Sequence, residues 1–207
     1  MFTVFVVDDD PGVVKALARL LRANGYAVQT FTSPQEFLGK HNPSIPGCAL
    51  LDVSMPGIDG LELQRALVAS KDTCRPIIFL TGKGDIPTSV RAMKAGAVDF
   101  LTKPANDVEI LAAIARAADQ DSRARRDFTE LEVIKRKIAT LTPREREVLR
   151  HVVAGRLNKQ IAGDLGTVEK TVKVHRGRMM EKMGVRSVAD LVRLAEKVGL
   201  GKSTMSG

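Results

Sequence analysis

The feature that most constrains the fold of this chain is a repeated change of hydrophobic pattern over its first 120 residues. Short apolar runs rich in β-branched residues predict strands over residues 2–7, 27–31, 48–51, 76–80 and 97–101. A segment with apolar residues at helical spacing follows each run. Five strand–helix pairs in succession favour an α/β fold, in which helices cover both faces of a parallel sheet.

Capping residues predict where the first helices begin and end. Pro11 suits a first helical turn, and Asn24-Gly25 suits a helix end. Ser33 can cap the second helix, and Glu36 can reach back to complete a capping box. The remaining helices are expected through 61–67, near 88–94 and over 108–118.

Polar residues follow the predicted strands at their carboxyl ends, where ligands collect in sheets of this type. The acidic run 8–10 follows the first strand, Asp52 the third, Thr81 the fourth and Lys103 the fifth. Carboxylates gathered at one edge repel one another unless a cation lies among them, and an oxygen-rich site with few protein ligands suits Mg²⁺. A carboxylate beside such a metal can act as a nucleophile and form an aspartyl phosphate. Lys103 would supply positive charge to the phosphoryl group, and Thr81 a hydrogen bond.

Five ordered motifs in this region resemble those of the receiver domain of bacterial two-component response regulators. They are Val6-Val7-Asp8-Asp9-Asp10, Leu51-Asp52-Val53-Ser54-Met55-Pro56-Gly57, Thr81-Gly82-Lys83-Gly84-Asp85, Lys94-Ala95-Gly96-Ala97-Val98-Asp99-Phe100 and Lys103-Pro104. The resemblance implies a flavodoxin-like (βα)5 domain in which Asp52 is the phosphoacceptor and Asp8, Asp9 and Asp52 bind Mg²⁺.

The same resemblance implies roles for three further residues. Thr81 and Phe100 would form a switch pair, and Lys103 would contact the phosphoryl group. A cis peptide bond would precede Pro104. Two positions depart from the receiver pattern: Ala105, where relatives often carry a large apolar residue, and Lys83, in the loop after the fourth strand. Neither touches the acidic site, but both could change the partner surface.

Some of these residues also suit plainer structural roles. Asp10 can cap the first helix rather than bind metal, and Asp8 or Asp9 can be a solvated strand end. Thr81 can be a turn residue, and Phe100 an aromatic residue of the core.

Charge is distributed unevenly along the chain, whose net charge is +8. Residues 1–120 carry 12 Lys and Arg against 13 Asp and Glu, whereas residues 121–207 carry 20 against 11. A basic module joined to a neutral one indicates a polyanionic partner. Nucleic acid is favoured over a membrane, because no strongly apolar helix face accompanies the charge. A merely solvated basic surface is the alternative.

Residues 121–140 are predicted to link a domain over 1–120 to a second domain over 141–207. The linker is highly charged and contains neither glycine nor proline, and Leu131, Ile134 and Ile138 lie near helical spacing. A partly helical connection and a frayed, charged linker both fit this pattern.

The last part of the chain opens with a strong helix start. Thr142-Pro143-Arg144-Glu145 combines a threonine cap, a proline in the first turn and a capping-box glutamate. That helix is expected to end at Gly155, a second short helix to cover about 158–165, and Gly166 to make a tight turn into a third. A short helix, a glycine turn and a longer helix form the helix-turn-helix pattern.

The third helix has two distinct faces when residues are placed about 100° apart. The predicted buried stripe consists of Val168, Val172, Met179 and Met183. The opposite face carries Lys170, Lys173, Val174, Gly177 and Glu181. This second face suits a DNA major groove, although a solvated helix face is the alternative.

Individual side chains of this helix suit different DNA contacts. Lys173 can reach a guanine edge, and Val174 can reach a thymine methyl group. Arg176 and Arg178 flank the face and can hold phosphates. His175 projects near the buried stripe, which favours a packed or capping histidine over base reading.

Five motifs here resemble the four-helix DNA-binding domain of LuxR-type and NarL-type regulators. They are Leu141-Thr142-Pro143-Arg144-Glu145-Arg146-Glu147-Val148-Leu149, Asn158-Lys159-Gln160-Ile161-Ala162, Leu165-Gly166, Thr171-Val172-Lys173-Val174-His175-Arg176 and Lys182-Met183-Gly184-Val185-Arg186-Ser187. The predicted DNA contacts are Asn158, Lys159, Lys170, Thr171, Lys173, Val174, His175, Arg176 and Arg178. Gly177 departs from relatives with a polar or basic residue there. With the Gly-Asp-Ile-Pro loop, the combination most resembles the nitrogen-fixation (FixJ-like) branch of response regulators.

Together, the two resemblances imply a DNA-binding transcriptional response regulator that is not an enzyme in its own right. A sensor histidine kinase would phosphorylate Asp52 with the help of Mg²⁺, and dimerisation or release of the basic domain would tighten binding to double-stranded promoter DNA. The resemblance also allows contact with RNA polymerase. No signal peptide or membrane span is evident at the N-terminus, so a cytoplasmic protein with reduced Cys48 and Cys74 is expected.

Two other classes of function compete with this prediction. One is a metal-dependent phosphotransferase or phosphatase that acts on small molecules through Asp52, but no substrate-pocket insertion is present and the basic domain would be unexplained. The other is a DNA-binding or scaffolding protein with an inert receiver, which the intact acidic set argues against.

Overall fold

The computed structural model describes residues 1–69, 75–82 and 86–200, and its elements fall into two compact units. The first unit spans Met1–Arg125 and the second Arg126–Gly207. Their division falls inside the long helix α5, Asp107–Ala139. The charged linker is therefore helical in the structure, and the helix expected over 108–118 continues through it.

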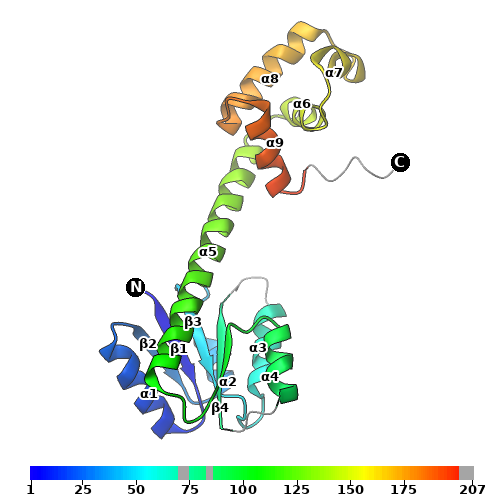
Figure 1. Cartoon of the computed structure of the whole chain (residues 1–207). Helices are drawn as coiled ribbons and strands as arrows, with labels where there is room; N and C mark the ends of the chain where they lie inside the picture. The colour runs from blue at the N-terminus through cyan, green and yellow to red at the C-terminus, as the bar shows by residue number, and fades with distance from the viewer. Residues whose placement is uncertain (70–74, 83–85, 201–207) are drawn as a thin grey trace. The chain divides into compact units, whose positions relative to one another are not determined.

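The first unit is a parallel sheet with helices on both faces, as the hydrophobic alternation predicts (Figure 1). The strand order is β2-β1-β3-β4-β5. The strands are β1 Thr3–Val7, β2 Ala27–Phe31, β3 Gly47–Leu51, β4 Ile77–Thr81 and β5 Asp99–Thr102. The helices are α1 Pro11–Ala23, α2 Pro34–Lys40, α3 Gly60–Ala69, α4 Ile86–Lys94 and the first part of α5.

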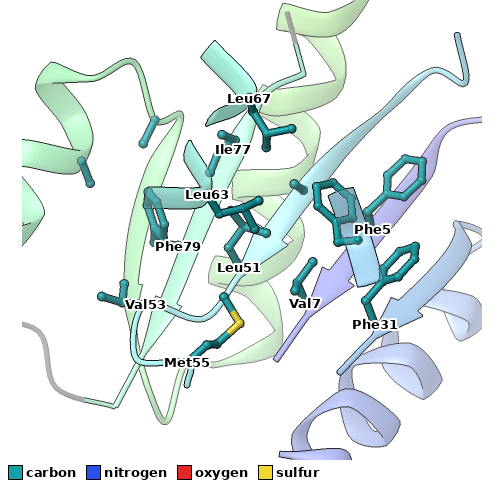
Figure 2. Close-up of a cluster of buried hydrophobic side chains, with 14 residues drawn as sticks. Phe5, Val7, Phe31, Leu51, Val53, Met55, Leu63, Leu67, Ile77 and Phe79 are labelled. Carbon is teal, nitrogen blue, oxygen red and sulfur yellow. The ribbon is translucent and has the colours of Figure 1, made fainter. Parts of the chain in front are cut away.

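Alternate residues of each central strand point to two separate hydrophobic cores. Phe5, Leu51 and Phe79 face the core that Phe37 of α2 and Leu63 of α3 complete (Figure 2). The neighbouring strand residues face the second core, which α1 and α5 cover; its members include Val6, Leu50, Ile78, Leu17 and Ile114. Because both faces are covered, β1, β3 and β4 are buried along their whole length.

The predicted caps of the first helices are present. Asp10 caps α1 by accepting the backbone N–H groups of Gly12, at 2.7 Å, and Val13, at 3.4 Å. Ser33 caps α2 by accepting the N–H of Glu36 at 3.2 Å. The Glu36 carboxylate reaches back to the N–H of Thr32 at 3.3 Å rather than to that of the cap residue, so the expected capping box is displaced by one residue.

The first part of α5 is fastened to the receiver-like unit by Arg125. Its guanidinium donates to the carbonyl oxygens of Pro43, Ser44 and Ile45 at 2.9–3.1 Å, and its Nε donates to Asp121 of the preceding turn. These bonds anchor a helix segment whose own sequence has little apolar periodicity. They hold this part of α5 against the segment that precedes β3.

The second unit contains the four predicted helices, α6 Pro143–Val153, α7 Asn158–Asp164, α8 Glu169–Met183 and α9 Val188–Lys197. Thr142 and Glu145 form the predicted capping box at the start of α6. One hydrophobic core joins the helices, with Val148, Leu149, Ile161, Met179 and Leu191 among its buried members. Gly166, with φ of +59°, makes the turn between α7 and α8.

One member of the predicted buried stripe of α8 is wrong. Val172, Met179 and Met183 are fully buried, but the side chain of Val168 is 65% exposed. Val168 is the N-cap of α8 and has extended backbone angles. Placing residues 100° apart is valid only within a helix, and Val168 lies just outside it.

The two cysteines and the loop after β4 were also considered from the sequence. Cys48 is buried and has a free thiol, whereas Cys74, Lys83 and the first two residues of the Gly-Asp-Ile-Pro loop lie outside the described residues. No helix in the described ranges is both long enough and apolar enough to cross a bilayer.

Candidate functional site

Three predicted site residues from separate strands meet at the carboxyl edge of the sheet. The Nζ of Lys103 donates to Oδ2 of Asp8 at 2.6 Å and to Oδ1 of Asp52 at 2.8 Å. Both carboxylates are buried, while the Lys103 side chain is 24% exposed. Two acids that follow β1 and β3 therefore share the ammonium group of a lysine that follows β5.

Backbone hydrogen bonds fix these three residues in register with the sheet. The N–H of Asp52 donates to the carbonyl of Val7 at 2.9 Å, which extends the β1–β3 pairing by one residue. The N–H of Lys103 donates to the carbonyl of Thr81 at 2.7 Å and extends the β4–β5 pairing in the same way. Gly60, at the start of α3, packs on Asp52; a Cβ there would lie 2.3 Å from the Asp52 carbonyl oxygen.

Each carboxylate also accepts a backbone N–H two residues further along the chain. Oδ1 of Asp8 accepts from Asp10 at 3.0 Å, and Oδ2 of Asp52 accepts from Ser54 at 2.6 Å. These backbone donors fix the orientation of both carboxylate groups. These N–H groups were not predicted from the sequence, although a donor two residues after an aspartate that follows a strand is a local signal that indicates them.

Lys103 is held in its charged form at this site. Burial alone lowers the pKa of an ammonium group, but the hydrogen bonds to Asp52 and Asp8 outweigh it, so the pKa of Lys103 is raised above its ordinary value. The group therefore remains a cation at neutral pH.

The remaining predicted residues of this edge lie at the end of β4 and in β5. Thr81 is fully buried at the end of β4. Phe100 is partly buried against the first core, with its ring centroid 6.0 Å from that of Phe79, which agrees with the core role considered from sequence. The peptide bond between Lys103 and Pro104 is cis, as the resemblance implies.

The acidic residues fit a magnesium ion in donor type, but not all of the predicted ligands come together. Asp8 and Asp52 supply hard carboxylate oxygens on either side of a single cationic group, and Mg²⁺ is bound in proteins by one or two carboxylates and several waters. Asp9 is exposed and Asp10 is engaged as a helix cap. Within the described ranges, no group of three His, Cys, Asp or Glu side chains is arranged to hold a metal.

The second unit presents the predicted DNA-contacting residues on the outer side of α8 and at the start of α7. Lys170, Lys173, Val174 and Arg178 are exposed, and Thr171 and His175 are half-buried. Lys159, on α7, is also exposed. Nζ of Lys173 lies 3.5 Å from Oε1 of Glu169, one turn earlier on the helix.

Two of these residues are bonded to each other. Nη1 of Arg176 donates to Oδ1 of Asn158 at 2.9 Å, which ties α8 to the first turn of α7. A second tie, not identified from sequence, comes from α6: Nη2 of Arg144 donates to the carbonyl of Leu165, the C-cap residue of α7, at 2.6 Å. Nothing local to Arg144 indicates this contact, because its partner lies 21 residues away.

The two halves of the chain match two family models. Residues 4–115 match the response regulator receiver domain, and residues 139–195 match the LuxR family of bacterial regulatory proteins. The chain belongs to the response regulators with a LuxR-type DNA-binding domain. It is thus a transcriptional regulator of a two-component system, a family of regulators rather than of conventional enzymes.

Curated relatives resemble the response regulator over nearly its whole length. Nodulation protein W of Bradyrhizobium diazoefficiens is 45% identical over 197 residues, which cover 95% of this chain and 86% of the relative. Transcriptional regulatory protein FixJ of Rhizobium meliloti is 44% identical over 202 residues, which cover 98% of each chain.

Solved structures give the same result. The low-resolution structure of response regulator StyR is 46% identical, with a TM-score of 0.83, covering 95% of this chain and 98% of that one. Full-length FixJ from B. japonicum is 39% identical, with a TM-score of 0.57, covering 96% of this chain and 97% of that one. The predicted FixJ-like family, the flavodoxin-like fold and the helix-turn-helix unit are confirmed.

Proposed function

We propose that a sensor histidine kinase phosphorylates Asp52 of this response regulator and that the phosphorylated state binds promoter DNA more tightly. The observation that carries the first half of the proposal is the bridge from Lys103 to the buried carboxylates of Asp8 and Asp52. A cation held between two acids at this edge can neutralise both the acceptor and an arriving phosphoryl group.

Transfer of the phosphoryl group to Asp52 is a nucleophilic substitution at phosphorus. An Asp52 carboxylate oxygen forms a bond to phosphorus, the bond from phosphorus to the kinase imidazole nitrogen breaks, and that nitrogen keeps the electron pair. The Ser54 N–H holds one Asp52 oxygen, and the Lys103 ammonium supplies charge beside the other. These two donors orient the acceptor before transfer.

Asp8 and Asp52 would hold Mg²⁺ together with Asp9, which follows Asp8 in the sequence. The bound ion would supply positive charge that offsets repulsion between carboxylate and phosphoryl oxygens. In this proposal Lys103 remains with the phosphoryl group.

A switch requires that the two states of the receiver bind the phosphoryl group with different free energies, because a ligand with equal affinity for both shifts nothing. We assign that difference to Thr81, whose hydroxyl would bond the phosphoryl group, and to Phe100, which would repack. Their strands adjoin α4, so the surface around α4 and β5 would change. Dimerisation or release of the DNA-binding unit would follow.

DNA recognition is assigned to the exposed face of α8. Lys173 would read a guanine edge and Val174 a thymine methyl group, with phosphate contacts from Lys159, Lys170, Arg176 and Arg178 and supporting contacts from Asn158, Thr171 and His175. Replacing Lys173 would weaken specific binding by about 1–3 kcal/mol if it reads a base. An equal loss on all DNA sequences would reduce it to a phosphate contact. We further propose that the protein binds paired DNA half-sites, contacts RNA polymerase and acts in the cytoplasm.

The intact mass of the protein after incubation with Mg²⁺ and acetyl phosphate tests the phosphoacceptor. We expect one phosphate adduct on the wild type, and none on Asp52→Asn or on the wild type with EDTA. No adduct with acetyl phosphate or with a cognate kinase would favour the inert-receiver alternative. Sustained release of phosphate from a small ester would instead favour the phosphatase alternative.

A further inference from the structure

Residues 130–138 of α5 lie before the LuxR-family match, which begins at residue 139, yet they belong structurally to the DNA-binding unit. Ile134 is 2% exposed and packs in the same core as Val172, Met179 and Met183 of α8, and Ile138 packs against that core. Lys197 of α9 forms an ion pair with Glu130 at 2.5 Å. This segment of α5 is therefore a fifth helix of the unit.

Two lysines cross between the end of this segment and the end of α8. Nζ of Lys137 donates to the carbonyl of Met183, the last residue of α8, at 3.0 Å. Nζ of Lys182 donates in the opposite direction, to the carbonyl of Thr140 at 3.3 Å and to Oε2 of Glu145 at 2.7 Å. Lys137 thus joins α5 to the last residue of α8. Lys182 joins α8 to Thr140, which follows α5, and to Glu145 of α6.

The Lys137 contact suits the end of a helix for two physical reasons. The last carbonyls of a helix have no partner within it, and they carry the negative end of the helix dipole, so an ammonium group there is favourable. The Lys137 ammonium group also lies close to Gly184, whose φ is +67°. A Cβ on Gly184 would lie only 2.9 Å from Lys137 Nζ. The lysine is seated against the C-terminal turn of α8.

We propose that Lys137 is a positioning residue for DNA recognition: it fixes the C-terminal end of α8 and thereby the angle at which the exposed face of α8 meets the base edges. Lys137 does not touch DNA in this proposal. The proposal rests on the assignment of base reading to α8, and the experiment below separates failure of the one from failure of the other.

The test compares full-length Lys137→Met with full-length Lys135→Met, which removes the same charge two residues away. Lys135 is 61% exposed and pairs with Glu132 of its own helix, so its loss leaves α8 untouched. The DNA probes are a duplex selected by the wild type from a random-sequence pool and an unselected duplex of equal length. If the wild type does not prefer the selected duplex, the assignment of base reading fails before the variants are compared.

We expect Lys137→Met to lose up to about tenfold in affinity for the selected duplex, because one charged hydrogen bond can bias the orientation of α8 toward its binding-competent position by about that factor. Its affinity for the unselected duplex should match that of Lys135→Met, and Lys137→Arg should recover part of the loss. Equal affinities of the two methionine variants for the selected duplex would overturn the proposal. Equal losses on both duplexes would also overturn it, because they would make Lys137 a phosphate contact.

A second measurement needs no variant and so stands even if Lys137→Met folds poorly. Lysine residues of the wild type are labelled with an amine-reactive ester, and the rate at each site is followed by peptide mass spectrometry. Lys137 should react several-fold more slowly than Lys135, because Lys137 is half-buried with its ammonium group against the C-terminal turn of α8, whereas the Lys135 side chain is 61% exposed. Equal rates would show that the contact is not maintained and would overturn the proposal.

Discussion

Replacing Lys103 with methionine tests whether its ammonium group stabilises the receiver by bridging Asp8 and Asp52, an arrangement called the clamp below. The change keeps an unbranched apolar stem but leaves two carboxylates, whose side chains are 3% and 6% exposed, without their shared cation. Removing one partner of a fully buried ion pair costs about 3–5 kcal/mol. Because Lys103 is 24% exposed and each acid retains a backbone donor, we expect a loss of about 2–3 kcal/mol in the free energy of unfolding.

The measurement can be confined to the receiver. The chain contains one tyrosine and no tryptophan, and Tyr26 lies in the first unit, so urea unfolding followed by tyrosine fluorescence reports on that unit. The control is Lys15→Met, on the exposed side of α1, which should change the stability by less than about 0.5 kcal/mol.

Magnesium supplies the second half of this prediction. With the ammonium group gone, a divalent cation at the two acids should restore part of the stability by mass action, so Lys103→Met should gain more from added Mg²⁺ than the wild type does. A Lys103→Met protein as stable as Lys15→Met in EDTA, or one that gains no more from Mg²⁺ than the wild type, would refute the clamp.

Three further predictions concern other parts of the protein. Val168→Ser should stabilise the DNA-binding unit by about 0.5–2 kcal/mol in thermal melting, because the N-cap of α8 now has no side-chain hydrogen bond; no gain would contradict the cap assignment. Burial raises the pKa of the Cys48 thiol to about 12, so a thiol reagent should label Cys48 only after unfolding, and rapid labelling of the native protein would be the opposite result. Hydrogen bonds from Lys182 and Thr142 hold the pKa of Glu145 below its ordinary value of 4.5, so its contribution to stability is present above that pH and is lost as the pH falls through the lowered pKa. Urea unfolding followed by circular dichroism should therefore separate Glu145→Gln from the wild type at pH 7, and the difference should shrink as the pH is lowered below 4.5; a constant difference would contradict this linkage.

Local sequence signals predicted the parts of the fold that local interactions decide. The caps at Asp10 and Thr142 depend on residues two or three positions away, so the residue types alone indicate them. The sheet followed from the alternation of strand and helix patterns, because covered parallel strands must be apolar on both faces.

Tertiary contacts decide what the sequence did not predict. The contacts of Arg125 in α5 are one example, because its partners are carbonyl groups about 80 residues away and no helical periodicity indicates such a contact. Arg75 is another example: its guanidinium is buried 4.0 Å from the centre of the Phe5 ring and donates to the carbonyl of Asn42, although arginine is ordinarily an exposed residue.

The candidate site was predictable in its members but not in its geometry. Strand ends gave Asp8, Asp52 and Lys103 as neighbours at one edge. Only the strand order β2-β1-β3-β4-β5 places β1 beside β3, and the length of the Lys103 side chain then determines that one ammonium group reaches both acids. Asp9, also predicted as a metal ligand, is exposed, whereas its neighbour Asp8 is buried.

The most direct test of the central proposal is the affinity of the full-length protein for a duplex selected from a random-sequence pool, before and after phosphorylation. The wild type, with its phosphate adduct verified by mass, should bind the selected duplex more tightly than the unphosphorylated protein, and Asp52→Asn should show no change under the same treatment. Equal affinity of the phosphorylated and unphosphorylated wild type would contradict the account, because Asp52 would then carry a phosphate that does not control DNA binding.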